Sequence, residues 1–148
     1  MAQHPNQAIY RPSFSPDERW ISFHARTSAL GRTIYVAPVH AETASPPSEW
    51  IALTDGTTLD YETCWSPDGL IYFLSDRDGF RCIWALRPDL KTKRTDGPPF
   101  PVLHFHTSRR ALSNIVNTAY VGLTVTRDRM IYLPGEITAN IWMAEIGR

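Results

Sequence analysis

A hairpin motif that occurs three times constrains the fold of this chain more than any other sequence feature. Its clearest copy is the turn at 66–69 (S-P-D-G), which lies between two apolar segments. Pro67 presets φ at the second turn position, Asp68 can hydrogen-bond to the backbone, and Gly69 accepts a left-handed conformation. The motif therefore predicts two short antiparallel strands joined by a tight turn.

Two further copies of this turn stand at 14–17 (F-S-P-D) and 125–128 (V-T-R-D). Each copy is followed by a β-like segment and then, after a polar turn, by a second such segment that starts with Ile. Repetition at a period of about 40 to 60 residues indicates a repeat architecture in which each unit is one supersecondary motif. We expect three units of one plan, with these approximate bounds: 7–56, 57–107 and 118–148.

Apolar and aromatic segments bounded by turn residues predict strands throughout the chain. The expected strands are 9–14, 20–24, 31–39, 49–54, 61–65, 70–74, 80–86, 102–106, 120–125, 130–133 and 140–145. The third unit lacks its outer strand, and the segment 107–118 could hold a single helical turn. The sequence thus predicts an all-β fold of antiparallel four-stranded units, which is typical of β-propeller blades.

Several of these segments resemble the repeats of TolB-like β-propellers. The resemblance rests on the S-P-D-G turn at 66–69, I-Y-F at 71–73, S-D-R-D-G at 75–79, I-W at 83–84 and L-T-D-G at 53–56. The segment 136–143 is similar to the last blade of such proteins. This resemblance implies half of a six-bladed propeller, a protein-binding role and a location in the bacterial periplasm.

Three blades cannot close a ring, so two sheet faces and two strand edges need covering. We expect a homodimer of three plus three blades, or association with the remaining blades of a longer chain. The segment Asn6 to Tyr10 could supply edge pairing for the strand that the last unit lacks. The expected function is a non-catalytic module that binds protein or peptide. The alternative is an accessory propeller fragment of a peptidase or signalling enzyme whose catalytic domain lies elsewhere.

Composition and motifs exclude several other classes of protein. Fifteen basic and fifteen acidic residues give zero formal charge, so we expect no nucleic-acid partner. No apolar stretch reaches the roughly 18 residues of a membrane helix, and the first residues lack the pattern of a signal peptide, so a soluble protein is expected. G-x-S-x-G, G-x-G-x-x-G and P-loop patterns are missing as well, so we predict no catalytic residues, no cofactor and no enzyme activity.

Variation within the repeat frame indicates where a binding site could lie. Aligning the units places Arg11, Glu62 and Gly122 at one level of the innermost strands, and Tyr10 and Tyr61 at the next. Propellers bind partners at the central channel or on one rim. Arg11, Tyr61 and Glu62 are therefore the predicted binding residues.

His104 and His106 form an H-x-H pair, and strand alternation would direct both rings to one side. A third ligand is not evident from the sequence, so no metal is predicted and this pair remains a weak metal candidate. Asp76 and Asp78 precede Gly79 as in a calcium loop, but the same residues are the usual signal for a hairpin.

The cysteines and tryptophans are interpreted as structural. Cys64 and Cys82 would lie two strands apart, which at about 4.8 Å per strand is beyond disulfide reach, so both are expected to be packed thiols. Large rings at matching repeat positions are expected to fill the space between the sheets. These are Trp20, Trp50, Trp65, Trp84 and Trp142.

Overall fold

The computed structural model describes residues 8–29, 31–106, 110–112 and 122–136. This part of the chain is all-β and every strand pair is antiparallel, as predicted. Within these residues the only helical element is the 3₁₀ turn η1 (Pro47–Glu49). None of them forms a helix with the length and apolar character needed to cross a membrane.

The first sheet is a meander of four strands in the order β1-β2-β3-β4. Its strands are β1 (Ile9–Phe14), β2 (Trp20–Arg26), β3 (Arg32–Pro38) and β4 (Ile51–Ala52). The predicted strand at 9–14 has these bounds, whereas the predicted strand at 49–54 is reduced to two residues because η1 occupies its start. Ile9 and Tyr10 pair with β2, and residues 6 and 7 lie outside the described part of the chain.

The second sheet repeats this meander in the order β5-β6-β7-β10. Its strands are β5 (Tyr61–Trp65), β6 (Ile71–Ser75), β7 (Cys82–Leu86) and β10 (Phe100–Leu103). A short ribbon, β8 (Pro88–Asp89) with β9 (Arg94–Thr95), stands between β7 and β10 and was not predicted. The outer strand was expected at 102–106 but ends at Leu103. Proline at position 101 is tolerated there because β10 is an edge strand.

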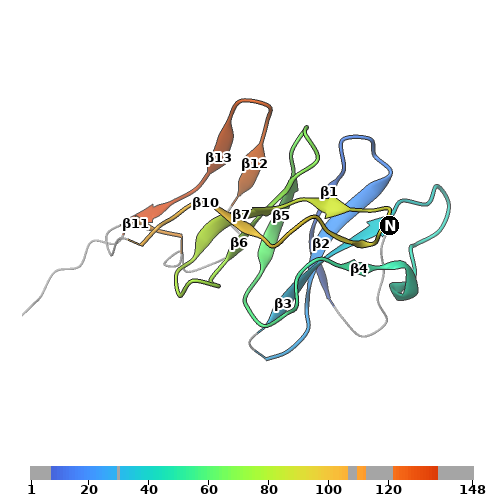
Figure 1. Cartoon of the computed structure of the whole chain (residues 1–148), viewed down its shortest axis with the longest axis horizontal. Coiled ribbons are helices and arrows are strands. Elements are labelled where there is room, and N and C mark those ends of the chain that lie inside the picture. Colours follow the sequence, from blue (N-terminus) through green and yellow to red (C-terminus); the bar gives the residue numbers. More distant parts are fainter. Residues whose placement is uncertain (1–7, 30, 107–109, 113–121, 137–148) are drawn as a thin grey trace, which may run out of the picture.

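The third region contains the hairpin β12 (Leu123–Val125) and β13 (Met130–Tyr132). A second ribbon pairs β11 (Arg110–Ala111) with β14 (Gly135–Glu136), where a helical turn had been considered possible. The predicted strand at 140–145 and Trp142 lie outside the described residues. Figure 1 shows the hairpins β1–β2, β5–β6 and β12–β13 beside one another, with their turns toward the same end of the molecule.

The three repeated turns share one hydrogen-bonding pattern, which explains why the motif recurs. The backbone N–H of Leu70 donates to Ser66 Oγ, and Ser66 Oγ donates to the Asp68 carboxylate. In the first turn Ser15 and Asp17 have these roles. In the third, Thr126 hydroxyl replaces serine and bonds Asp128 at 3.2 Å. A hydroxyl and an aspartate two residues later therefore specify the turn.

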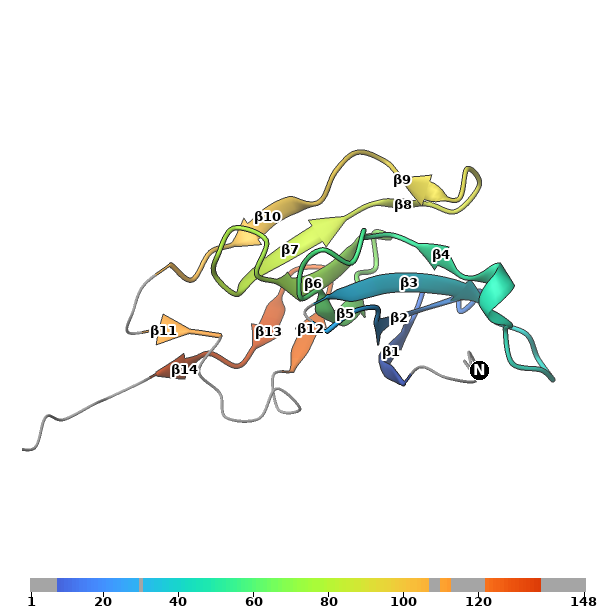
Figure 2. The ribbon, with the colours of Figure 1, turned by 90° about the horizontal axis from the view of Figure 1, so that it is seen from below.

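The sheets pack face to face in chain order. Ile34, Val36 and Ile51 of the first sheet join Ile71 and Phe73 of the second in one buried cluster. The opposite face of the second sheet packs on the last hairpin. The residues of this second interface include Tyr61, Leu74, Ile83, Leu123, Met130 and Tyr132. The innermost strands β1, β5 and β12 are neighbours, while β4 and β10 lie at the outer edges (Figure 2).

The tryptophans only partly follow the prediction. Trp65 is buried in the cluster between the first two sheets, and Trp20 and Trp84 pack against it. Trp50 instead lies on the opposite face of the first sheet, with its ring 4.7 Å from Phe23 in an edge-on contact. The shift follows from the shortened outer strand, since Trp50 precedes β4 and is not part of it.

Candidate functional site

Two of the predicted binding residues meet between the innermost strands. Arg11 in β1 and Glu62 in β5 both have positive φ, 52° and 58°, and each lies where the strand register shifts. Arg11 Nε donates to Glu62 Oε1 at 3.1 Å. Bulges of this kind re-aim side chains, and strained backbone of this kind collects at functional sites. The aligned repeat positions thus come together as one ion pair across two sheets.

The exposure of these residues separates their roles. Arg11 retains 44% of its side-chain exposure in the pair, while Glu62 retains only 9%. Burial raises the pKa of Glu62, and the charge of Arg11 opposes that rise. Arg11 can therefore contact a partner directly, whereas Glu62 acts by holding Arg11 in place.

Tyr61, the third predicted binding residue, is buried. It is 3% exposed, and among the described residues its hydroxyl has no hydrogen-bond partner. Burial raises its pKa, and the guanidinium of Arg81 lies 5.0 Å from its ring centre. Its ring meets the buried His24 edge-on. We assign Tyr61 to the core and do not count it among the contact residues.

His24 is a buried titratable group that the sequence did not reveal. Its Nε2 accepts from Arg32 Nη1 at 3.3 Å, so the ring is neutral and the proton is on Nδ1. Desolvation, together with the charges of Arg32 and Arg11, lowers its pKa to about 3. Tyr10 stacks on its other side, with ring centres 5.4 Å apart.

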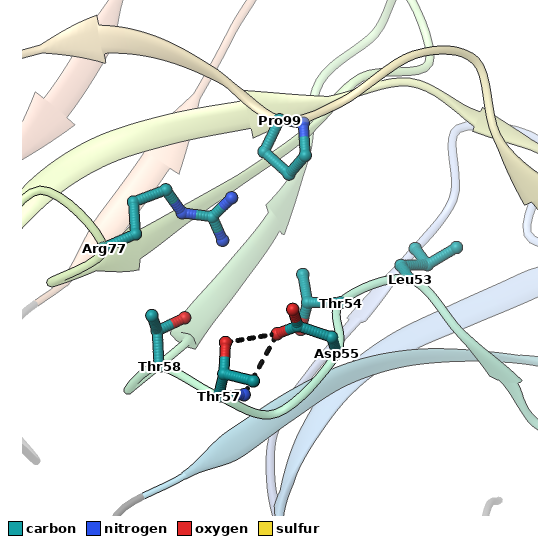
Figure 3. Close-up of a pocket in the computed structure, with 7 residues that line it drawn as sticks. All are labelled: Leu53, Thr54, Asp55, Thr57, Thr58, Arg77 and Pro99. Carbon is teal, nitrogen blue, oxygen red and sulfur yellow. Dashed lines mark hydrogen bonds between the residues drawn. The ribbon is translucent and has the colours of Figure 1, made fainter.

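Arg77 lines a pocket of about 430 Å³ between the β4–β5 connection and the β6–β7 hairpin. Figure 3 shows its guanidinium directed into the pocket, opposite Asp55 and the threonines beside it. This guanidinium is already engaged, since Arg77 Nη2 donates to the fully buried Asp60 at 3.0 Å. It also lies over the rings of Phe73 and Trp84. The pocket is therefore built around a structural arginine.

The predicted histidine pair forms a compact cluster at the edge of the second sheet. His104 Nδ1 and His106 Nε2 lie 3.1 Å apart, so the two rings do share one side, although both residues follow β10. Asp78 Oδ2 lies 3.0 Å from the first nitrogen and 2.9 Å from the second. Together with Cys82 Sγ, these ligand atoms all lie within 4.8 Å of one another.

Cys82 forms the buried floor of this cluster. It is fully buried and free, and its sulfur accepts the backbone N–H of Phe105 at 3.3 Å. Burial raises its pKa, which the N–H of Phe105 opposes. Burial would likewise raise the pKa of Asp78, but hydrogen bonds from His106 and from the Phe80 N–H outweigh it and lower that pKa.

The sequence made no third ligand evident, whereas the structure places two further side chains of ligand type, Asp78 and Cys82, beside the histidines. Asp78 comes from the β6–β7 turn and Cys82 from the start of β7, more than 20 positions before His104. The signal that could have found them is strand register: Ile83 pairs with Leu103, so the residues flanking this pair, Cys82 and His104, must be close. The segment 76–79, which has carboxylates spaced as in a calcium loop, forms a hairpin turn in which the Gly79 N–H donates to the Asp76 carbonyl at 2.8 Å.

No protein-family model matches this chain, and no curated protein matches it. The indications of function are therefore the packing of the sheets, the Arg11–Glu62 ion pair and the histidine cluster.

Proposed function

We propose that this chain forms consecutive blades of a TolB-like β-propeller and acts as a non-catalytic protein-binding module whose first partner is a second copy of itself. The arrangement of the sheets supports this proposal. Each sheet packs its face on the next, with the innermost strands adjacent, as blades do around a common axis. Such a stack can be continued at both ends, where each terminal sheet has an outward face.

The two end faces of the stack carry exposed apolar side chains, and this observation carries the proposal. On the last hairpin, Met130 and Tyr132 face the second sheet, while Ile131 and Leu133 are 60% and 53% exposed. On the first sheet, Phe14 pairs with Ile21, so it lies on the face directed away from the second sheet, and it is 58% exposed.

These two faces differ, so each contact would join two unlike surfaces. The last hairpin of one copy would pack on the first sheet of the other, and a two-fold rotation would repeat this contact and close the ring. Arg11 and Tyr10, both exposed on the innermost strand of the first sheet, would then lie near the axis of the assembly. A peptide bound on that axis would meet Arg11 as its charged contact.

Light scattering coupled to size exclusion tests this assembly. We expect a dimer at micromolar concentration, and a monodisperse monomer would overturn the proposal. Ile131→Asp and Phe14→Asp should each give monomers, because each places a charge in both contacts of the ring. Val102→Asp is the matched control, since Val102 is also an exposed apolar residue but lies in β10, the edge strand of the second sheet, and so belongs to neither end face.

Mixing the two monomeric variants distinguishes a ring from unspecific apolar association. A mixed pair of Ile131→Asp and Phe14→Asp chains has one intact contact and one contact with both changes. The mixture should therefore form heterodimers that neither variant forms alone, and their dissociation constant should exceed that of the unmodified dimer. Failure of the mixture to associate would argue against a contact between these two unlike faces.

A further inference from the structure

We propose that Asp78, Cys82, His104 and His106 form a binding site for one divalent transition-metal ion, with Zn²⁺ as the best-matched ion. The site lies within the second sheet and does not depend on whether the chains associate. Two imidazoles, a thiolate and a carboxylate are the ligand types that Zn²⁺ accepts in four-coordinate sites. All four are contributed by one corner of the sheet.

Hydrogen bonds can account for at most two of the three short contacts in this cluster. Three atoms, His104 Nδ1, His106 Nε2 and Asp78 Oδ2, lie 2.9 to 3.1 Å from one another. A ring nitrogen has one proton or one lone pair. The two nitrogens can therefore direct at most two protons into a triangle with three contacts. A cation at this point is satisfied by lone pairs from all three atoms at once.

The spacing of the two nitrogen ligands and the oxygen ligand fits a small ion. With metal–ligand distances of about 2.0 to 2.1 Å, neighbouring nitrogen and oxygen ligands of a tetrahedral site stand about 3.3 Å apart. The three observed separations are within a few tenths of an ångström of this value. The carboxylate and a deprotonated Cys82 supply two negative charges, which balance the charge of a divalent ion.

Surrounding residues hold the ligands in this arrangement. Phe80 stacks on His106 with ring centres 4.6 Å apart, and Trp84 meets His104 edge-on. The Phe105 N–H that donates to Cys82 Sγ is the type of outer contact that stabilises a metal thiolate. Contacts with these neighbours thus restrain both histidine rings and the Cys82 sulfur.

An ion at this corner would fix the outer strand of the second sheet. Asp78 belongs to the β6–β7 turn and the histidines follow β10, so the ion would link this turn to the segment after the outer strand. Binding to the folded state alone stabilises that state. We therefore expect Zn²⁺ to raise the melting temperature of the whole chain.

Equilibrium dialysis with Zn²⁺ and optical titration with Co²⁺ test the site in the full chain. We expect one ion per chain, a rise in melting temperature that a chelator reverses, and the visible spectrum of tetrahedral Co²⁺ with a thiolate charge-transfer band. Ca²⁺ should produce no shift, because nitrogen and sulfur are poor ligands for it. An absence of saturable binding, or a six-coordinate Co²⁺ spectrum, would overturn the proposal.

Variants then assign the ligands, with a matched control for each residue type. Cys82→Ser should abolish the charge-transfer band. His106→Gln should weaken Zn²⁺ binding by about tenfold or more, because loss of a residue that only supports a metal ligand already weakens binding by about that factor. Cys64→Ser and His40→Gln alter residues remote from the cluster and should bind as the unmodified chain does. Unchanged binding by His106→Gln would refute the assignment. If a variant does not fold, the Co²⁺ spectrum of the unmodified chain still decides.

Discussion

The first and second sheets have the same strand order. The corner where the outer strand meets the third strand, however, is closed by different side chains in the two sheets. In each sheet the outer strand reaches the third strand through a leucine: Leu53 bonds Ile34, and Leu103 pairs with Ile83. The residues that follow these leucines are therefore structurally equivalent. Thr54 of the first sheet corresponds to His104 of the second.

In the first sheet this corner is closed by hydroxyl groups and glycine. Thr54 Oγ1 accepts the backbone N–H of Ile34 at 3.0 Å, and Thr33 bonds Thr27 at 3.2 Å. Gly31 and Gly56 approach so closely that a Cβ on Gly31 would lie 1.9 Å from the Gly56 oxygen.

In the second sheet the equivalent positions carry larger groups with ligand atoms. Cys82 stands where Thr33 would be, and Phe80 stands where Gly31 would be, since both precede an aligned Ile. One backbone corner can thus be filled by close packing or can present metal ligands. The proposed metal site therefore depends on the side chains at this corner and does not require a different fold.

The largest effect is expected from Gly31→Ala, which tests whether the first corner is closed by backbone contact. Its added methyl would collide with the Gly56 carbonyl, an atom that cannot move without shifting the chain. We expect the free energy of unfolding to fall by about 3 kcal/mol or more, at the upper end of the cost of overpacking. Chemical denaturation measures this change.

Gly79→Ala is the control from the corresponding turn of the second sheet. Gly79 has φ of 86° but nothing within 4 Å of an added Cβ, so only the left-handed backbone is penalised. We expect a loss of about 1 kcal/mol. If Gly31→Ala costs no more than Gly79→Ala, the first corner is not closed by backbone contact between Gly31 and Gly56.

The next largest effect is the loss of stability in acid that His24 should cause. In the second sheet the equivalent residue is Leu74, which does not titrate. In the folded chain the pKa of His24 is about 3, whereas an unfolded histidine has about 6.5. The unfolded state therefore binds more protons between these values, and stability falls as the pH is lowered. Between pH 7 and pH 5 the loss should be about 2 kcal/mol, at about 1.4 kcal/mol per pH unit.

The variant His24→Leu isolates this contribution. It should be less sensitive to pH across the same interval by about 2 kcal/mol, whatever its stability at pH 7. Glu62, whose raised pKa acts in the opposite direction, is present in both proteins and cancels in the difference. Equal pH dependence of the two proteins would show that His24 takes up a proton without unfolding.

The sequence predicted the longer strands because their signals are local. The bounds of β1 and β5 were predicted as observed, since each apolar segment is bounded by turn residues. The two-residue ribbons β8–β9 and β11–β14 were missed, because two residues are too few to show a period.

The site was predicted less completely than the strands, because it depends on register. Alignment of the repeats brought Arg11 and Glu62 to one level, and the structure joins them in an ion pair. The same alignment could not show that Tyr61 is buried. Asp78 and Cys82 were not associated with the histidines because the bounds of β10, and the pairing that follows from them, could not be read from composition or spacing.

The smallest expected effect is the loss of stability when the hydroxyl of a repeated turn is removed, and it should differ between a buried turn and an exposed one. Ser66→Ala removes the acceptor of the Leu70 N–H in a region where both residues are buried, so we expect a loss of about 1 to 2 kcal/mol. Thr126→Ala removes the same bond from the Arg129 N–H, but water can replace it at this exposed turn, and about 0.5 kcal/mol should be lost. Urea denaturation of both variants measures the difference, with Thr126→Ser as the control that keeps the hydroxyl. Equal losses at the two turns would mean that the motif contributes through the conformation it imposes and not through the burial of its hydrogen bond.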